Sequence, residues 1–259
     1  MEKRNRRPDR SGGKMSIYVP TDEDRKAYEG LEIVILTPVG SYEVHAKFAK
    51  CVANLIAYSW MHGLKIYQMG ITERMVVDWA RNDLARQASE QTNEYTGNKF
   101  SHFLWLDDDH VFNPDLACYL ARLADLDMVS ALYFGRTQHL PVAYVKDDSG
   151  DKYKHYPLIE APRALAEVDA VGFGALLMRR DVFDRVPEPW FTLDWHAGED
   201  IAFCVRAKEH GVKVWLDGSY ALGHIGPPQI VTEATYKQYL IDHAEEFKDR
   251  IKVPLGSAA

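Results

Sequence analysis

Apolar runs alternate with amphipathic segments through the first half of the chain. Four runs have the length of buried strands: LEIVILT (31–37), LKIYQMG (64–70), FSHFLWL (100–106) and DMVSALYF (127–134). Helices are predicted over about 42–60, over a segment that contains RNDLARQA, and from Pro114 to Leu123, because proline suits a first helical turn. This alternation predicts a largely parallel, doubly wound sheet with its binding crevice at the carboxyl ends of the strands.

The second half of the chain has a different pattern. Residues 138–160, with several Tyr, Pro, Asp and Gly, predict a hairpin or excursion, and VDAVGFGALLMRR (168–180) predicts an apolar strand region that two glycines interrupt. A helix is expected over about 198–210, then a strand at KVWLD (213–217), the segment LGHIG (222–226) and a final amphipathic helix. The predicted fold class is therefore α/β, with a mixed, mostly parallel sheet flanked by helices.

Two regions differ in composition. Residues 1–29 are polar and carry five clustered basic residues, so we expect a flexible basic N-terminal arm, either a solvated tail or a contact for an anionic acceptor or membrane. The clustered basic residues are Lys3, Arg4, Arg6, Arg7 and Arg10. Residues 30–250 are expected to form a single domain, with halves 30–136 and 137–250.

Charge and cysteine content narrow the possible partners. The chain of 259 residues has a net charge of -7, which argues against general nucleic-acid binding because phosphate-backbone affinity comes from clustered Lys and Arg. Its three cysteines are far apart and form no Cys-x-x-Cys motif, which favours a reduced, intracellular setting. No apolar run reaches the roughly 18 residues that span a bilayer. We expect a cytoplasmic protein without a transmembrane segment, with peripheral membrane contact left open.

Three consecutive carboxylates, Asp107, Asp108 and Asp109, follow a buried apolar strand. They repel one another and lose solvation there, and a divalent cation with oxygen ligands is the usual compensation. A solvated turn that caps the next helix is the alternative. The Walker B pattern also ends a strand in Asp, but it needs a Gly-x-x-x-x-Gly-Lys-Ser/Thr loop, which this sequence lacks. A bound cation then needs another role, and holding a diphosphate is the most natural one for hard oxygen ligands in an open α/β crevice.

Seven segments in a fixed order resemble family 2 and related GT-A glycosyltransferases over roughly residues 31–226. They are LTPVG, RNDLA, FLWLDDD, DMVSALYFGR, VGFGALLMRRDVF, GEDIAFCVRAKEHG and LGHIG. The resemblance implies a GT-A (Rossmann-like) fold whose first half binds the nucleotide and whose second half holds the acceptor and catalytic residues.

The resemblance also implies roles for individual residues at the donor site. The base and ribose would contact Thr37, Pro38 and Val39, and Arg81 and Asn82 would lie beside the nucleotide. Asp107 or Asp108 would face the ribose. Asp109 and His224 would bind the metal that bridges the two phosphates. Because imidazole suits Mn²⁺ better than Mg²⁺, we expect Mn²⁺.

The remaining implied roles concern the sugar and the acceptor. Gly172, Phe173 and Gly174 would form the floor under the donor sugar, although the glycines would also suit a strand bulge. Glu199 and Asp200 match the Glu-Asp pair of inverting members, with Asp200 as general base, although acidic residues are favoured at any helix start. Further candidates are residues that border the donor pocket (Tyr133, Phe134, Arg136) or contact the acceptor (Trp195, His196).

The expected function is transfer of a sugar from a nucleotide diphosphate sugar, a UDP- or GDP-linked hexose, to a hydroxyl acceptor with inversion. Three alternatives stay open: a retaining enzyme of the same fold, a sugar nucleotidyltransferase, and a non-catalytic nucleotide-sugar-binding module. A nucleotidyltransferase normally has basic residues in the loop after its first strand, and TPVGSYEVH has none of Lys or Arg. The sequence does not indicate the donor base, the acceptor or the oligomeric state.

Overall fold

Helices and strands alternate along the computed structural model, which describes residues 17–147, 149, 152–158, 164–193, 197–226 and 230–244. The helices are α1 (Asp22–Ala27), α2 (Ala46–Met61), α3 (Val77–Glu90), α4 (Leu116–Ala121), α5 (Asp181–Arg185), α6 (Glu199–Glu209) and α7 (Glu233–Asp242). The strands are β1 (Ile33–Thr37), β2 (Ile66–Ile71), β3 (His102–Leu106), β4 (His110–Val111), β5 (Met128–Leu132), β6 (Ala143–Lys146), β7 (Tyr153–His155), β8 (Leu165–Val168), β9 (Ala170–Val171), β10 (Ala175–Arg179), β11 (Val214–Ala221), β12 (Gly223–Ile225) and β13 (Ile230–Val231). In this described part of the chain, no helix combines the length and apolarity that a membrane span requires.

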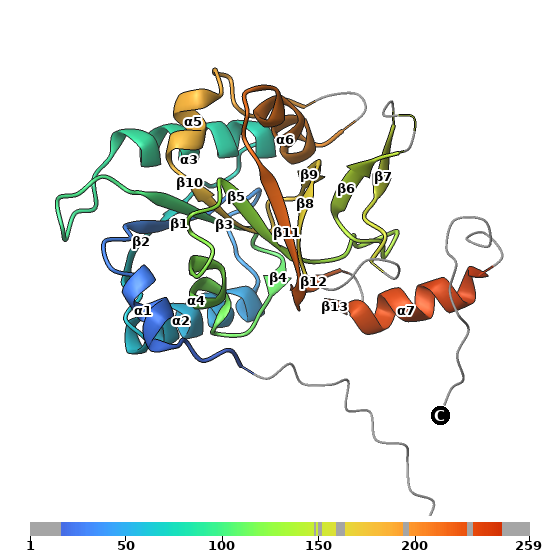
Figure 1. Cartoon of the computed structure of the whole chain (residues 1–259), viewed down its shortest axis with the longest axis horizontal. Coiled ribbons are helices and arrows are strands. Elements are labelled where there is room, and N and C mark those ends of the chain that lie inside the picture. The colour runs from blue at the N-terminus through green and yellow to red at the C-terminus, as the bar shows by residue number, and fades with distance from the viewer. Residues whose placement is uncertain are drawn as a thin grey trace, which may run out of the picture.

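A seven-stranded sheet with the order β2-β1-β3-β10-β5-β11-β8 forms the centre of the molecule (Figure 1). β1 pairs in parallel with β2 and β3, and β5 pairs in parallel with β11. β10 runs antiparallel between β3 and β5, and β8 runs antiparallel to β11 at the edge. The predicted mixed, mostly parallel sheet is confirmed. Strands from both predicted halves pair within it, because β10 separates two strands of the first half.

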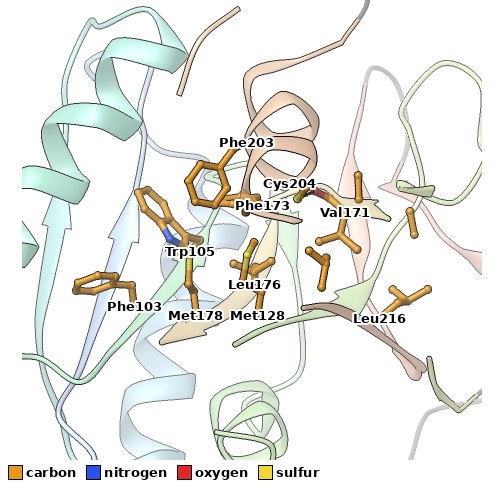
Figure 2. Close-up of a cluster of buried hydrophobic side chains, with 14 of the residues drawn as sticks. Phe103, Trp105, Met128, Val171, Phe173, Leu176, Met178, Phe203, Cys204 and Leu216 are labelled. Carbon is orange, nitrogen blue, oxygen red and sulfur yellow. Dashed lines mark hydrogen bonds between the residues drawn. The ribbon is translucent and has the colours of Figure 1, made fainter. Parts of the chain in front are cut away.

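Helices cover both faces of this sheet, which explains why its strands are continuous apolar runs. α3, α5 and α6 lie on one face, and α1, α2 and α4 on the other (Figure 1). Side chains alternate between the two cores: Phe103 and Trp105 of β3 pack under α3, α5 and α6, whereas Leu104 and Leu106 pack under α2 and α4. Figure 2 shows the first core, where Trp105 lies 5.8 Å from Phe173 between ring centroids.

Two small sheets flank the central one. β6 and β7 form the hairpin predicted within 138–160, and β6 also pairs with β9. β12 pairs antiparallel with β4 and β13, which brings the LGHIG segment against the residues that follow the three aspartates. The small sheet β13-β12-β4 positions the candidate site.

The segment 17–29 corrects the predicted N-terminal arm, because it packs on the domain. Thr21 and Asp24 form a capping box at the start of α1. Tyr28 is buried and its hydroxyl donates to the carbonyl of Cys118 at 2.7 Å. Asp115 of the α4 region accepts the backbone N–H of Tyr18 at 2.5 Å. The ring of Tyr28 is buried and its hydroxyl has a hydrogen-bond partner. This tyrosine therefore anchors a segment that was predicted, from its polar composition, to be a flexible arm. Residues 1–16 lie outside the described residues.

Candidate active site

The three aspartates form a tight turn between β3 and β4 at the carboxyl edge of the sheet. The N–H of Asp107 donates to Gly174 O and the N–H of His110 donates to Asp107 O, both at 3.3 Å. β4 then pairs with β12 so that His110 stands directly opposite His224. This cross-strand pair joins two parts of the chain that are more than a hundred residues apart.

A cluster of three possible metal ligands results, comprising Asp109, His110 and His224. One ligand atom from each residue lies within 4.8 Å of the others. Asp109 Oδ2 is 3.2 Å from His224 Nε2, and Asp109 Oδ1 is 3.1 Å from His110 Nδ1. The two imidazoles stack with centroids 4.4 Å apart. The structure therefore brings the two predicted ligands together. It adds His110, which the sequence signals only by its place directly after the aspartates.

Hydrogen bonding in this cluster favours a cation. His224 Nδ1 lies 2.8 Å from Phe134 O, and since a carbonyl only accepts, this nitrogen is the donor. Nε2 can then donate to the Asp109 carboxylate only when the ring is protonated, and in the neutral ring it presents a lone pair that a cation can take. Both ring nitrogens of buried His110 lack a hydrogen-bond partner among the described residues, although Nδ1 lies 3.1 Å from Asp109 Oδ1. A divalent cation would satisfy all three side chains.

The pKa shifts reflect the crowding of negative charge in the turn. Burial, followed by the charges of Asp109 and Asp107, raises the pKa of Asp108 to about 6. Burial also acts to raise the pKa of Asp109, but the contacts with His110 and His224, and the positive charge that these rings carry when protonated, hold it well below its usual range. The turn thus holds one carboxylate that is strongly stabilised as an anion beside one that is not.

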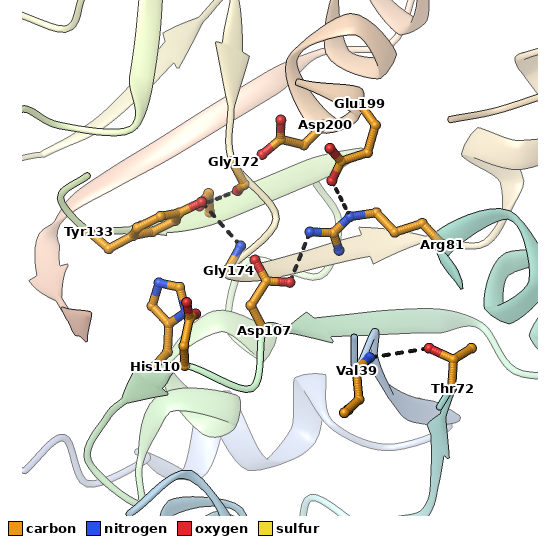
Figure 3. A network of polar contacts seen from close by, with 12 residues as sticks. Val39, Thr72, Arg81, Asp107, His110, Tyr133, Gly172, Gly174, Glu199 and Asp200 are labelled. Atoms are coloured by element: carbon orange, nitrogen blue, oxygen red, sulfur yellow. Dashed lines mark hydrogen bonds and ion pairs between the residues drawn. The ribbon is translucent and has the colours of Figure 1, made fainter. Parts of the chain in front are cut away.

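Arg81 connects the aspartate turn to the start of α6 (Figure 3). Its Nε donates to Glu199 Oε1 at 2.8 Å and its Nη2 to Asp107 Oδ1 at 2.9 Å, and the side chain is only 2% exposed. Its guanidinium also lies over the rings of Trp105 and Phe173. Arg81 therefore bridges two carboxylates, its Nη1 has no hydrogen-bond partner among the described residues, and its contact with a nucleotide stays a prediction.

The side chain of Asn82 makes its hydrogen bonds within the protein, and its place beside a nucleotide stays a prediction. Its Nδ2 donates to the carbonyls of Asp78 and Phe191 at 2.8 and 2.6 Å, and its Oδ1 accepts the N–H of Phe191 at 3.1 Å. These contacts use both N–H donors of the amide. Asn82 fastens the segment before α6 to α3 and has no free donor for a nucleotide.

Asp200 differs from its neighbour Glu199 at the start of α6. Glu199 is buried and paired with Arg81, whereas Asp200 is half-buried and has no salt bridge among the described residues. Asp200 Oδ1 accepts the N–H of Ile201 at 2.7 Å. Burial and the nearby charge of Glu199 raise the pKa of Asp200 to about 6, against the lowering effect of Arg81. Of the predicted pair, Asp200 is the carboxylate without an ion pair among the described residues, and its role as a base stays a prediction.

The two glycines around Phe173 allow close packing behind the candidate metal ligands. A Cβ at Gly174 would lie 2.5 Å from Cε1 and 2.7 Å from Nε2 of His110, and a Cβ at Gly172 would lie 1.8 Å from the Tyr133 hydroxyl. The Gly174 N–H donates to that hydroxyl at 3.3 Å. Phe173 is fully buried in the core, so its side chain cannot form the surface of a sugar site.

The three residues predicted to contact the base and ribose lie at the end of β1, at the carboxyl edge of the sheet, but they are buried. Thr37, Pro38 and Val39 expose almost no surface, and the N–H of Val39 donates to Thr72 Oγ1 at 3.2 Å (Figure 3). Beyond them, Tyr42 is 68% exposed and carries the guanidinium of Arg74 over its ring. The side chains exposed at this edge are therefore those of the following loop.

The other candidates divide into core and surface. Phe134 is buried and stacks on Tyr236 of α7, and Tyr133 packs edge-to-face on His110. Arg136 is exposed and reaches Asp109. Trp195 and His196 lie outside the described residues.

Comparison with known proteins gives similarity in structure alone. No protein-family model matches the sequence, and no curated protein matches it. Among solved structures, A197 from STIV is similar with a TM-score of 0.53 and 16% identity, over 78% of this chain and 94% of that chain. GalNAc-T7, solved with UDP, GalNAc and Mn²⁺, has a TM-score of 0.49 and 14% identity, over 85% of this chain and 50% of that chain. The expected GT-A fold is confirmed as a fold, and family 2 membership stays a prediction.

Proposed function

We propose that this protein is a metal-dependent glycosyltransferase that moves a sugar from a UDP- or GDP-linked hexose to a hydroxyl acceptor. The cluster of Asp109, His110 and His224 carries this proposal, because its lone pairs and negative charge converge at the carboxyl edge of a mostly parallel sheet. The absence of a P-loop in the sequence supports a sugar donor over a nucleoside triphosphate.

The three clustered side chains would hold the metal. A bound divalent cation would neutralise the diphosphate as it leaves the sugar. Two imidazoles among three ligands support Mn²⁺ over Mg²⁺, because Mg²⁺ favours oxygen ligands. Asp107 is paired with Arg81, so Asp108 is the carboxylate of the turn that we assign to the ribose.

Asp200 is the proposed base. Its raised pKa leaves it ionised at neutral pH and improves its ability to take the proton of an acceptor hydroxyl. Glu199 is excluded from this role because Arg81 holds it in a buried ion pair. We assign Glu199 and Arg81 to positioning the start of α6 against the aspartate turn. A single displacement with Asp200 as base inverts the anomeric centre.

A panel of nucleotide sugars tests the proposal. We expect release of nucleoside diphosphate with one UDP- or GDP-sugar in Mn²⁺, and loss of release when a chelator is added. The Asp109→Ala variant should lose metal-dependent donor binding, measured by calorimetry, whereas Asp181→Ala, on a half-buried carboxylate of α5, should not.

The products separate the remaining functions. Pyrophosphate release instead of nucleoside diphosphate would indicate a nucleotidyltransferase, and donor binding without any turnover would indicate a binding module. Retention of the anomer, seen by NMR of the product, would remove Asp200 as a simple base. Unchanged donor affinity in Asp109→Ala would contradict the metal site.

A further inference from the structure

Arg136 is an exposed cationic residue that contacts Asp109, one of the three candidate metal ligands. It lies in a turn after β5 that is closed by hydrogen bonds from Gly135 N to Leu140 O at 2.9 Å and from His139 N to Gly135 O at 3.0 Å. Its side chain is 56% exposed, and its Nη1 is 3.1 Å from Asp109 Oδ2. A short, closed turn therefore carries a long charged side chain to the mouth of the site.

The guanidinium and a bound metal would compete for one oxygen. Asp109 Oδ2, which Arg136 contacts, is also the oxygen 3.2 Å from His224 Nε2. A divalent cation between Asp109 and His224 would take this oxygen and would repel a guanidinium only a few ångströms away. Among the described residues, Arg136 is the only Lys or Arg that pairs with Asp109. Metal binding would therefore displace Arg136 from Asp109.

A displaced Arg136 would stay beside the metal, because its turn is fixed at both ends by backbone hydrogen bonds. A planar guanidinium is well suited to two oxygens of a phosphate. Arg81 is less well placed for this role, because it is buried together with its unpaired Nη1 and is held by Asp107 and Glu199 through its other two nitrogens. Arg136 is thus the described arginine placed to meet phosphates held at the cluster.

We propose that Arg136 exchanges partners during donor binding: it neutralises Asp109 in the metal-free protein and turns to the donor diphosphate once metal is bound. This inference rests on the proposed function. It makes Arg136 both a competitor of the metal and a ligand of the nucleotide, so its removal should have opposite effects on the two affinities.

Calorimetric titration of Mn²⁺ alone tests the first half of the exchange. The Arg136→Gln variant should bind Mn²⁺ about 3- to 10-fold more tightly than the unmodified protein, because a screened positive charge near the cation is removed. The control is Arg86→Gln, because Arg86 lies on α3 and carries the same charge in an exposed ion pair with Glu188. Its Mn²⁺ affinity should stay within about 2-fold of the unmodified protein.

Titration of nucleotides in saturating Mn²⁺ tests the second half. Arg136→Gln should weaken UDP or GDP binding about 10-fold, because charge-assisted hydrogen bonds to phosphate are lost. UMP and GMP lack the second phosphate, so their binding should change much less. Arg136→Lys should recover part of the diphosphate affinity, since it keeps the charge without the planar fork.

The possible results are distinct. Weaker binding of both Mn²⁺ and diphosphate would make Arg136 a structural residue and overturn the exchange, and so would unchanged affinities. Tighter Mn²⁺ binding with unchanged diphosphate binding would also overturn it. If the unmodified protein bound no Mn²⁺, or if Asp109→Asn bound it equally well, the metal site itself would be wrong and the inference would fall with it.

Discussion

The imidazole of His224 acquires its tautomer from a backbone carbonyl that is 90 positions away in the sequence. The sequence placed Asp109 and His224 as a pair through the resemblance of their segments. It did not indicate His110, because nothing in a lone histidine after three aspartates reveals whether its ring turns inward. The pairing of β4 with β12 turns it inward, and the same pairing stacks it on His224.

Activity should depend on pH through Asp200. A base must be ionised, and the raised pKa means that Asp200 gains its proton as the pH falls through about 6 instead of near 4. We expect kcat/KM to fall about tenfold for each pH unit below about 6. The measurement is a pH profile of nucleoside diphosphate release at saturating Mn²⁺. Asp200→Asn should lack this acid limb in its residual activity, and a limb near pH 4 would speak against Asp200.

At the scale of elements, the site depends on how closely three backbone segments approach one another. β10 begins just after Gly174, and its antiparallel insertion beside β3 presses this glycine against His110. Arg81 reaches from α3 to both the turn after β3 and the start of α6. The sequence predicted each of these elements, but it did not predict the bridge that Arg81 forms, because a buried arginine bridge has no local sequence signal.

The Gly174→Ala substitution should damage the metal site. Its Cβ would lie within 2.7 Å of His110 Nε2, so the imidazole must move. We expect about 10-fold weaker Mn²⁺ binding and a loss of about 1–3 kcal/mol in the free energy of unfolding. Gly40→Ala is the matched control, because nothing lies within 4 Å of the added carbon. Calorimetry and denaturant unfolding measure both effects, and equal behaviour of the two variants would contradict the packing argument.

Two arginines of α3 should differ sharply in their contribution to stability. Arg81→Gln leaves the carboxylates of Asp107 and Glu199 without their shared partner, and we expect about 3 kcal/mol of destabilisation. Arg86→Gln removes an exposed pair with Glu188 and should cost less than about 1 kcal/mol. Urea unfolding with circular dichroism compares them. If Arg81→Gln were as stable as Arg86→Gln, the bridge would have no structural role.

At the scale of the whole molecule, the cluster of Asp109, His110 and His224 joins the first half of the chain to its last strands. β4 and β12 meet only when the central sheet is formed, so an unfolded chain offers no such site. The segment 17–29, which precedes β1, packs on the α4 side of the central sheet through the buried Tyr28. Ligand binding to this arrangement should therefore be linked to global folding.

Mn²⁺ should stabilise the folded protein. At a concentration about 100 times the dissociation constant, the gain is about 2.7 kcal/mol, because the ion binds the folded state alone. Thermal unfolding with Mn²⁺ and with a chelator measures the shift in Tm. Asp109→Asn should show no shift, and an equal shift in that variant would place the bound ion elsewhere.

The sequence by itself determined the α/β class, the positions of the main strands and helices, and the carboxyl edge where Asp109 would lie. These depend on local information: apolar periodicity, proline and glycine, and the order of short segments. Only the tertiary structure decided that His110 joins the cluster, that Arg81 braces two carboxylates, that Thr37–Val39 are buried, and that Arg136 contacts Asp109. Each of these depends on side chains that are far apart in the sequence, and their contact is created by strand pairing and burial.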